Sequence, residues 1–171
     1  MDDDGGKRTG SVFRTTPDLQ TERMLTGIHI PNTLSMSHDR KTFYVADSKL
    51  QTLFAHDMAD LTKIRRFADT RGEPGSPDGS AVDAHGYVWN AQWGAWRLVR
   101  YAPDGRVDMT IPMPVEQPSS CAFGGADMTT LFVTSAWDEL SPQKRASQPV
   151  AGGLFAMETG VKGLALPLFE G

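Results

Sequence analysis

A repeat of about 45 residues restricts the possible folds of this 171-residue chain more than any other feature. Tyr44, Trp89 and Phe132 occupy matching places in three similar apolar segments, 45 and 43 residues apart. Within each repeat, a short apolar stretch and a turn come before the matching segment. A further stretch, with an apolar residue beside an aromatic one, comes after it. Four short strands per repeat of this length are typical of a β-propeller blade, and no window has a helical period.

The repeat predicts where the strands lie. Innermost strands are expected at Leu34–Ser37, Ser80–Asp83 and Cys121–Phe123, and second strands at Lys41–Asp47, Gly86–Gln92 and Thr130–Ala136. Third strands are expected at Leu53–Ala55, Val99–Tyr101 and Leu154–Ala156, and fourth strands at Lys63–Phe67, Val107–Ile111 and Val161–Leu166. A β-sandwich of short strands is the alternative, because its turns also recur every few residues.

The count of repeats predicts an incomplete ring. Gly10–Arg14 and Met24-Leu25 match only the third and fourth strands of a further blade, so residues 1–171 are interpreted as about three and a half blades. Residues 137–148 are more polar and contain Pro142, which predicts an inserted loop in the last repeat. Because propellers need about four to eight blades to close, we expect the chain to be the later part of a larger domain.

Composition narrows the class of protein. The 17 glycines and 11 prolines favour a turn-rich β chain. A net charge of −4 with interspersed signs argues against a nucleic-acid or anionic-membrane partner, and no apolar run approaches the ~20 residues of a membrane span. The start is acidic, unlike a signal peptide, and Cys121 is the single cysteine, so a cytoplasmic protein without an internal disulfide is expected.

Residues at the start of the innermost strands of a propeller converge on the central channel. Asn32 and Asp78 lie 46 residues apart, one repeat, and each follows a proline. Amide and carboxylate oxygens suit Ca²⁺, Mg²⁺ or Mn²⁺. The alternative is that both residues only form turns, as Pro103-Asp104-Gly105 is expected to do between two outer strands.

Three further residues are candidates for contacts with a substrate. Ser119 and Ser120 are in phase with Asn32 and Asp78, but no histidine-aspartate arrangement supports a serine hydrolase. Trp93 lies in a glycine-containing turn and either lines the mouth of the pocket or packs between blades.

At these positions the chain resembles the SMP-30/gluconolactonase/regucalcin-like family of six-bladed propellers, in its C-terminal part and in a bacterial branch. The resemblance covers nearly the whole chain in order, and the segments that carry it include Ile30–Ser35, Lys41–Ser48, Pro77–Asp83, Trp93–Arg97, Val99–Gly105 and Gln148–Phe155. It implies one divalent cation on the axis, with Asn32 and Asp78 as ligands. Thr33 stands where the family has glycine, and the family's ligand glutamate, its Asn-Asp-Gly motif and a substrate-contacting arginine have no counterpart here.

The resemblance implies hydrolysis of a sugar lactone, of the gluconolactone or arabinonolactone type, to the aldonic acid. A cation (Ca²⁺, Mn²⁺, Zn²⁺ or Mg²⁺) would act as Lewis acid, Asp78 as general base and Asn32 as a neutral ligand. Two alternatives stay open: a non-catalytic Ca²⁺-binding propeller or interaction module, and an inactive, truncated product.

Overall fold

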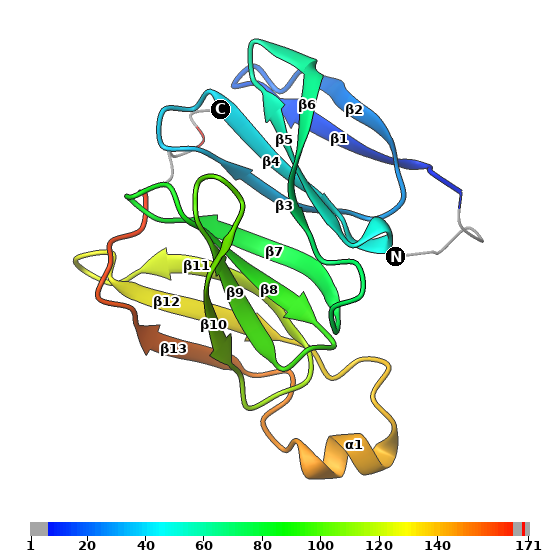
Figure 1. Ribbon diagram of the computed structural model, residues 1–171, viewed down its shortest axis with the longest axis vertical. Helices are drawn as coiled ribbons and strands as arrows, with labels where there is room; N and C mark the ends of the chain where they lie inside the picture. Colours follow the sequence, from blue (N-terminus) through cyan, green and yellow to red (C-terminus); the bar gives the residue numbers. More distant parts are fainter. Residues whose placement is uncertain (1–6, 166–168, 170–171) are drawn as a thin grey trace.

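The computed structural model describes residues 7–165 and 169. Within this part of the chain the strands form four antiparallel sheets (Figure 1). A hairpin comes first, with β1 at Gly10–Thr15 and β2 at Thr21–Ile28. The next sheet contains β3 (Pro31–Met36), β4 (Thr42–Asp47), β5 (Thr52–Asp57) and β6 (Asp60–Asp69). The third contains β7 (Ser76–Val82), β8 (Val88–Trp93), β9 (Arg97–Tyr101) and β10 (Val107–Pro112), and the fourth contains β11 (Pro118–Gly124), β12 (Thr130–Ser135) and β13 (Leu154–Glu158).

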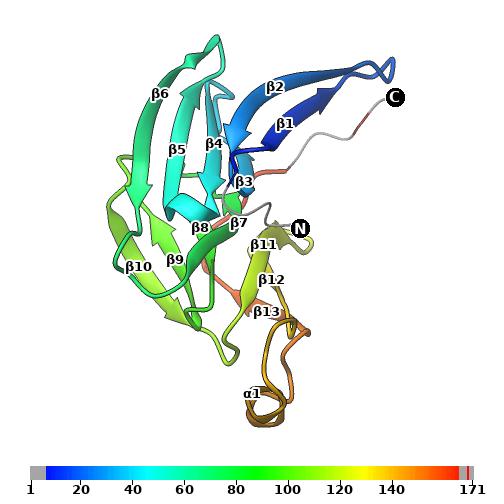
Figure 2. The same cartoon turned by 90° about the vertical axis from the view of Figure 1, so that its right-hand side faces the viewer.

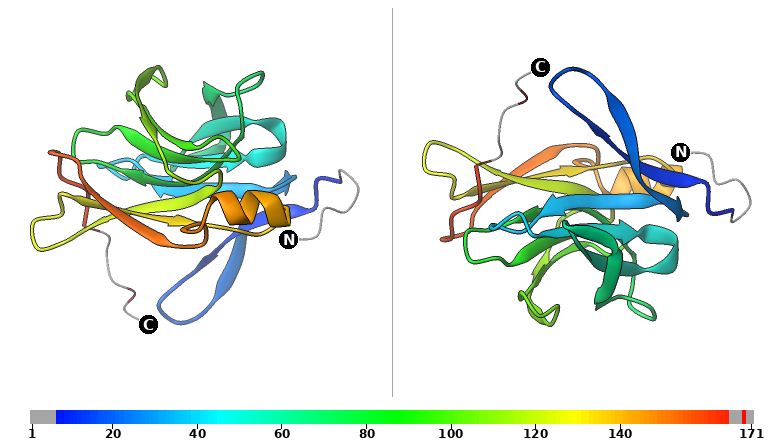
Figure 3. Two further views of the ribbon diagram at one scale, coloured as in Figure 1. Left: turned by 90° about the horizontal axis from the view of Figure 1, so that it is seen from below. Right: turned by 90° about the horizontal axis from the view of Figure 1, so that it is seen from above.

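The sheets follow one another along an open arc. In Figure 2 the arc runs from the β1–β2 hairpin through sheets β3–β6 and β7–β10 to sheet β11–β13, and Figure 3 shows the hairpin splayed away from the other sheets. Strands adjacent in sequence pair within each sheet, and the first strand β7 contacts the first strands β3 and β11 of the two neighbouring sheets. This arrangement has the blade order that the repeat predicted, not the two facing sheets of a sandwich.

Apolar residues fill the spaces between neighbouring sheets. One cluster, with Tyr44, Leu53, Phe67, Val88 and Tyr101 among its members, lies between sheets β3–β6 and β7–β10. A second cluster, which includes Trp89, Leu98, Cys121 and Leu131, lies between sheets β7–β10 and β11–β13. Successive residues of a strand point to opposite faces, so β4 and β8 bury both faces. This explains why their sequences read as nearly continuous apolar runs.

Each first strand contains one extra residue near its start. The pairing register shifts between Asn32 and Ser35 in β3, between Pro77 and Ser80 in β7, and between Pro118 and Ser120 in β11. Such a β-bulge leaves a residue outside the regular pairing and changes the direction of its side chain. The residues predicted to face the channel therefore lie at the bulges.

Two predictions about the last repeat are wrong in part. The expected fourth strand Val161–Leu166 is not formed by its described part, residues 161–165, where Gly163 instead forms an isolated bridge with Asp83 of the neighbouring sheet; Leu166 lies outside the described residues. Residues 137–148 are not a loop throughout, because Pro142–Ser147 forms helix α1. Ser141 caps that helix by accepting a hydrogen bond from the Lys144 amide, and Pro142 occupies its first turn.

The turn at Pro103-Asp104-Gly105 joins β9 to β10, as predicted, and Gly105 has a φ of 90° there. The connection between β4 and β5 contains a short 3-10 helix, η1, at Ser48–Leu50. In the described part of the chain no helix is long and apolar enough to cross a membrane.

Candidate functional site

Asn32 and Asp78 lie at the bulges of two adjacent first strands, β3 and β7. Pro31 and Pro77 precede them and cannot donate a backbone hydrogen bond, which suits the irregular pairing at these points. Both side chains are half-buried. The structure thus places the two predicted ligands near the starts of the first strands of two neighbouring sheets.

The carboxamide of Asn32 is held by Ser48, the first residue of η1 after β4. Its Nδ2 donates a hydrogen bond to Ser48 Oγ at 3.0 Å, and Ser48 Oγ donates to the carbonyl oxygen of Pro77 at 2.6 Å. Because the amino group is used in this way, Asn32 Oδ1 is left as the acceptor of the carboxamide. The hydroxyl of Ser48 also joins the residue beside Asp78 to Asn32.

The carboxylate of Asp78 differs from the other buried carboxylates described in the structure. Asp47 accepts hydrogen bonds from His29 and Ile30, and Asp83 is ion-paired with Arg100. Within the described residues, the carboxylate of Asp78 has no ion pair and accepts no hydrogen bond from another side chain. Burial raises the pKa of Asp78 to about 6, although the backbone of Gly79 beside the carboxyl group lowers it. A half-buried carboxylate without a cationic partner is suited to bind a cation.

The backbone of Asp78 is held by side chains from both sheets. Its carbonyl oxygen accepts hydrogen bonds from Thr33 Oγ1 at 2.6 Å and from Asn90 Nδ2 at 2.9 Å. Asn90 also donates to Ser80 Oγ at 2.8 Å, and its Oδ1 accepts a hydrogen bond from Gln92 Nε2. Asn90 and Gln92 are fully buried. Neither residue was predicted from the sequence, although two amides within the apolar strand β8 were a visible signal.

The three candidate substrate residues have different surroundings. Ser120 is exposed and lies directly against Gly79, the residue that follows Asp78. Trp93 is half-buried and pairs with Ser76 at the start of β7. Ser119 is half-buried, and its hydroxyl shares a hydrogen bond of 2.9 Å with Thr134 Oγ1 in its own sheet. Ser120 and Trp93 therefore flank the start of β7, whereas Ser119 is already engaged.

The donor atoms of Asn32 and Asp78 determine which kind of cation the two side chains could bind. Carboxylate and carboxamide oxygens are the hard donors that Ca²⁺ and Mg²⁺ prefer. The described residues contain no group of three or more His, Cys, Asp or Glu side chains placed to hold a metal ion. Asn32 and Asp78 offer one carboxamide and one carboxylate of this kind, and the six or more ligands that Ca²⁺ takes would have to include other groups.

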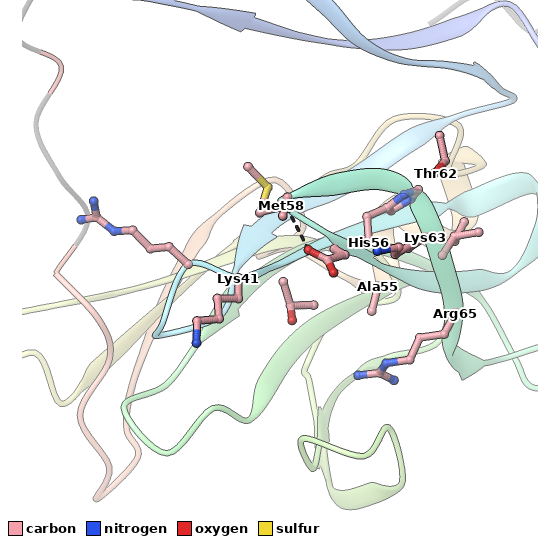
Figure 4. A pocket seen from close by; sticks show the side chains of 12 residues that line it. Lys41, Ala55, His56, Met58, Thr62, Lys63 and Arg65 are labelled. Carbon is pink, nitrogen blue, oxygen red and sulfur yellow. Dashed lines mark hydrogen bonds between the residues drawn. The ribbon is translucent and has the colours of Figure 1, made fainter.

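A broad open groove of about 1070 Å³ lies at the other end of sheet β3–β6 (Figure 4). Lys41 precedes β4, His56 belongs to β5 and Arg65 belongs to β6, so the groove crosses three segments of this sheet. Its lining also contains Arg40 and Lys63 and includes neither Asn32 nor Asp78. The groove is therefore separate from the candidate cation site.

Comparison with known proteins identifies the family. The family model "SMP-30/Gluconolactonase/LRE-like region" matches residues 1–137. The L-arabinolactonase of Azospirillum brasilense is 38% identical over an alignment of 178 positions, and the match covers 100% of this chain and 59% of that protein. The 6-deoxy-6-sulfogluconolactonase of Pseudomonas putida is 34% identical over an alignment of 168 positions, and the match covers 95% of this chain and 57% of that protein.

A solved structure gives the same assignment. The calcium-binding protein regucalcin from Agrobacterium tumefaciens matches with a TM-score of 0.89 and 32% identity, over 95% of this chain and 57% of that chain. The chain thus spans 57–59% of the length of these three relatives. Its sheets are blades of the β-propeller that such relatives form. The chain belongs to the SMP-30/gluconolactonase/LRE-like family.

Proposed function

We propose that this chain carries part of a divalent-cation site at which a sugar lactone, of the gluconolactone or arabinonolactone type, is hydrolysed to its aldonic acid. The names of the Azospirillum and Pseudomonas relatives support this class of substrate. The observation that carries the proposal is the carboxylate of Asp78, which is half-buried, lacks a cationic partner in the described structure and lies on the strand next to Asn32.

The chemistry follows from the two side chains. A bound divalent cation supplies a Lewis acid that polarises a lactone carbonyl. Asn32 offers a neutral oxygen, so it does not cancel the positive charge at the site. Asp78 is mostly ionised at neutral pH, since its pKa is raised only to about 6. Its carboxylate can therefore accept the proton of the attacking water and act as general base.

Contacts to the sugar are assigned to the residues around the start of β7. Ser120 is exposed beside Gly79, and Trp93 is half-buried at the end of β8. The hydroxyl of Ser120 and the aromatic surface of Trp93 suit the hydroxyl groups and the ring of a sugar lactone. Ser119 would contribute only if it released its hydrogen bond to Thr134.

A second candidate function is calcium binding without catalysis. The Agrobacterium relative is described as a calcium-binding protein, and Asn32 and Asp78 would serve such a site equally well. The identity of the ion is open between Ca²⁺, Mn²⁺, Zn²⁺ and Mg²⁺. Measuring acid release and cation binding separately on the same variants distinguishes the two functions.

The proposal also includes a cytoplasmic setting with a small-molecule partner. The chain has one cysteine, Cys121, which is buried as a free thiol. The net charge of −4 favours neither nucleic acid nor an anionic membrane.

The test measures acid release from gluconolactone and arabinonolactone by the purified chain with Ca²⁺, Mn²⁺, Zn²⁺ or Mg²⁺. Calorimetric titration of each ion serves as a second readout. Asp78→Ala and Asn32→Ala should each lower ion affinity at least about tenfold, since each removes a ligand. Asp104→Ala is the matched control, because Asp104 has the same Pro-Asp-Gly setting but is exposed and paired with Arg106. Acid release that Asp78→Ala leaves unchanged would contradict the assigned mechanism.

A further inference from the structure

Thr33 has a backbone conformation that threonine rarely adopts. Its φ is +68°, in the left-handed region that disfavours β-branched residues, and the residue is only 3% exposed. Glycine would adopt this conformation without strain. A threonine in this position is therefore explained best by an interaction of its side chain.

That interaction is with the neighbouring blade. Thr33 Oγ1 donates to the carbonyl oxygen of Asp78 at 2.6 Å, across the boundary between sheets β3–β6 and β7–β10. Asn90 Nδ2 donates to the same oxygen at 2.9 Å and lies 3.2 Å from Thr33 Oγ1. One carbonyl thus accepts a hydroxyl from one blade and a buried carboxamide from the other.

Ser48 makes the matching connection one residue earlier in β7. Its hydroxyl donates to the carbonyl of Pro77 and accepts from the carboxamide of Asn32. The carbonyls of Pro77 and Asp78 are consecutive, and both are held by hydroxyls of sheet β3–β6. Consequently, hydrogen bonds link the two candidate ligands, which lie on different blades.

We propose that Thr33, Ser48 and Asn90 form a latch between the two blades that sets the separation and orientation of Asn32 and Asp78 for a divalent cation. The role in cation binding rests on the proposed function, but the latch itself is a property of the cation-free chain. We class the three residues as positioning residues, because their hydrogen bonds go to Asn32 and to the carbonyl oxygens of Pro77 and Asp78. The hydrogen bond from Thr33 Oγ1 to the Asp78 carbonyl offsets the strain of the left-handed backbone at Thr33.

The test compares Thr33→Gly with two controls. Thr33→Gly removes the hydroxyl and relieves the left-handed strain, so the chain should fold. Thr33→Ser keeps the hydroxyl. Ser35→Ala removes another hydrogen bond between the same blades, from Ser35 Oγ to Ser80 O at 2.9 Å, and leaves Asp78 untouched.

Two readouts are needed. The first is the amide NMR signal of Gly79 in the cation-free chain, because this amide belongs to the same peptide group as the Asp78 carbonyl that Thr33 and Asn90 hold. The second is Ca²⁺ affinity by calorimetry. Thr33→Gly should shift the Gly79 signal and weaken Ca²⁺ binding about five- to tenfold, the value of one hydrogen bond. Thr33→Ser and Ser35→Ala should match the unaltered chain in both measurements.

The outcomes separate the latch from the proposed function. If Thr33→Gly leaves both the Gly79 signal and Ca²⁺ affinity unchanged while Asp78→Ala abolishes binding, the latch is wrong and the cation site stands. If the unaltered chain binds no cation, the cation site is wrong. The latch is then supported by a shift of the Gly79 signal in Thr33→Gly and overturned by an unchanged signal. A signal that also moves in Ser35→Ala would show general loosening between blades and would overturn the latch.

Discussion

Ser120 of β11 occupies the space that a side chain on Gly79 of β7 would need. A β-carbon on Gly79 would lie 2.5 Å from Ser120 Cβ and 2.8 Å from Ser120 Cα. Because one of these atoms belongs to the backbone, rotating the serine side chain cannot remove the overlap. The absence of a side chain after Asp78 therefore allows two first strands to approach each other at the candidate site.

Gly79→Ala is expected to destabilise the fold by about 1–3 kcal/mol, the usual cost of overpacking. Denaturant unfolding measures the loss. Gly72→Ala is the control: a β-carbon there meets nothing within 4 Å, so only the left-handed φ of 85° contributes, at about 1 kcal/mol. A Gly79→Ala chain as stable as the unaltered protein would show that β7 and β11 are not packed this closely.

The buried ion pair of Asp83 and Arg100 gives a second prediction. Arg100 Nη2 lies 2.6 Å from Asp83 Oδ2, the guanidinium stacks 3.7 Å from the centre of the Tyr87 ring, and Trp89 Nε1 donates to the same carboxylate. Asp83→Ala leaves a largely buried guanidinium without this partner, and should cost about 3–5 kcal/mol of unfolding free energy.

The matched control uses the other partner of the same arginine. Asp108 pairs with Arg100 Nη1 at 2.7 Å and is 33% exposed. Its replacement by alanine should cost less than about 1 kcal/mol, as for exposed ion pairs. Equal losses of unfolding free energy in Asp83→Ala and Asp108→Ala would show that burial does not make the Asp83–Arg100 pair the more important of the two.

Sequence patterns predicted those parts of the fold that local information determines. The apolar segments around Tyr44 and Trp89 are buried on both faces, and this regular burial made the repeat visible. Asn32 and Asp78 were predicted as a pair because each follows a proline at the same point of its repeat. Both lie at bulges of adjacent first strands. The repeat predicted their equivalent positions but not the bulges.

Features that depend on contacts between residues far apart in the sequence could not be predicted. Val161–Leu166 has the apolar content of a strand, yet Gly163 pairs with Asp83, which is 80 residues away in the sequence. Helix α1 has only six residues, too few to show a helical period. The bond from Thr33 to Asp78 spans 45 residues, and nothing in the residues next to Thr33 indicates it.

The third prediction concerns acid stability. Burial raises the pKa of Asp47, but hydrogen bonds from the backbone and ring of His29 and from the Ile30 amide outweigh burial, so the pKa is lowered overall. Asp47 therefore stabilises the fold above the unfolded-state pKa of about 3.9. This contribution is lost as the pH falls through the lower pKa of the folded state.

Asp47→Asn should flatten the acid side of the curve of unfolding free energy against pH. Denaturant titrations at several pH values measure that curve. Asp18→Asn, an exposed change in the turn after β1, should keep the slope of the unaltered chain. An unchanged acid slope in Asp47→Asn would show that the hydrogen bonds do not favour the ionised form.

The last prediction uses Cys121 to test the packing of the end blade. Burial raises the pKa of its thiol to about 12, and Sγ lies 3.2 Å from the Trp89 carbonyl oxygen, between sheets β7–β10 and β11–β13. The reactive species is the thiolate, so the native protein should not react with an aromatic disulfide reagent at mildly alkaline pH. Denaturant should expose one reactive thiol. Ala122→Cys, at the exposed neighbouring position, should add a thiol that reacts at once in the native state. Rapid labelling of Cys121 itself in the native protein would mean that sheet β11–β13 opens readily from its neighbour.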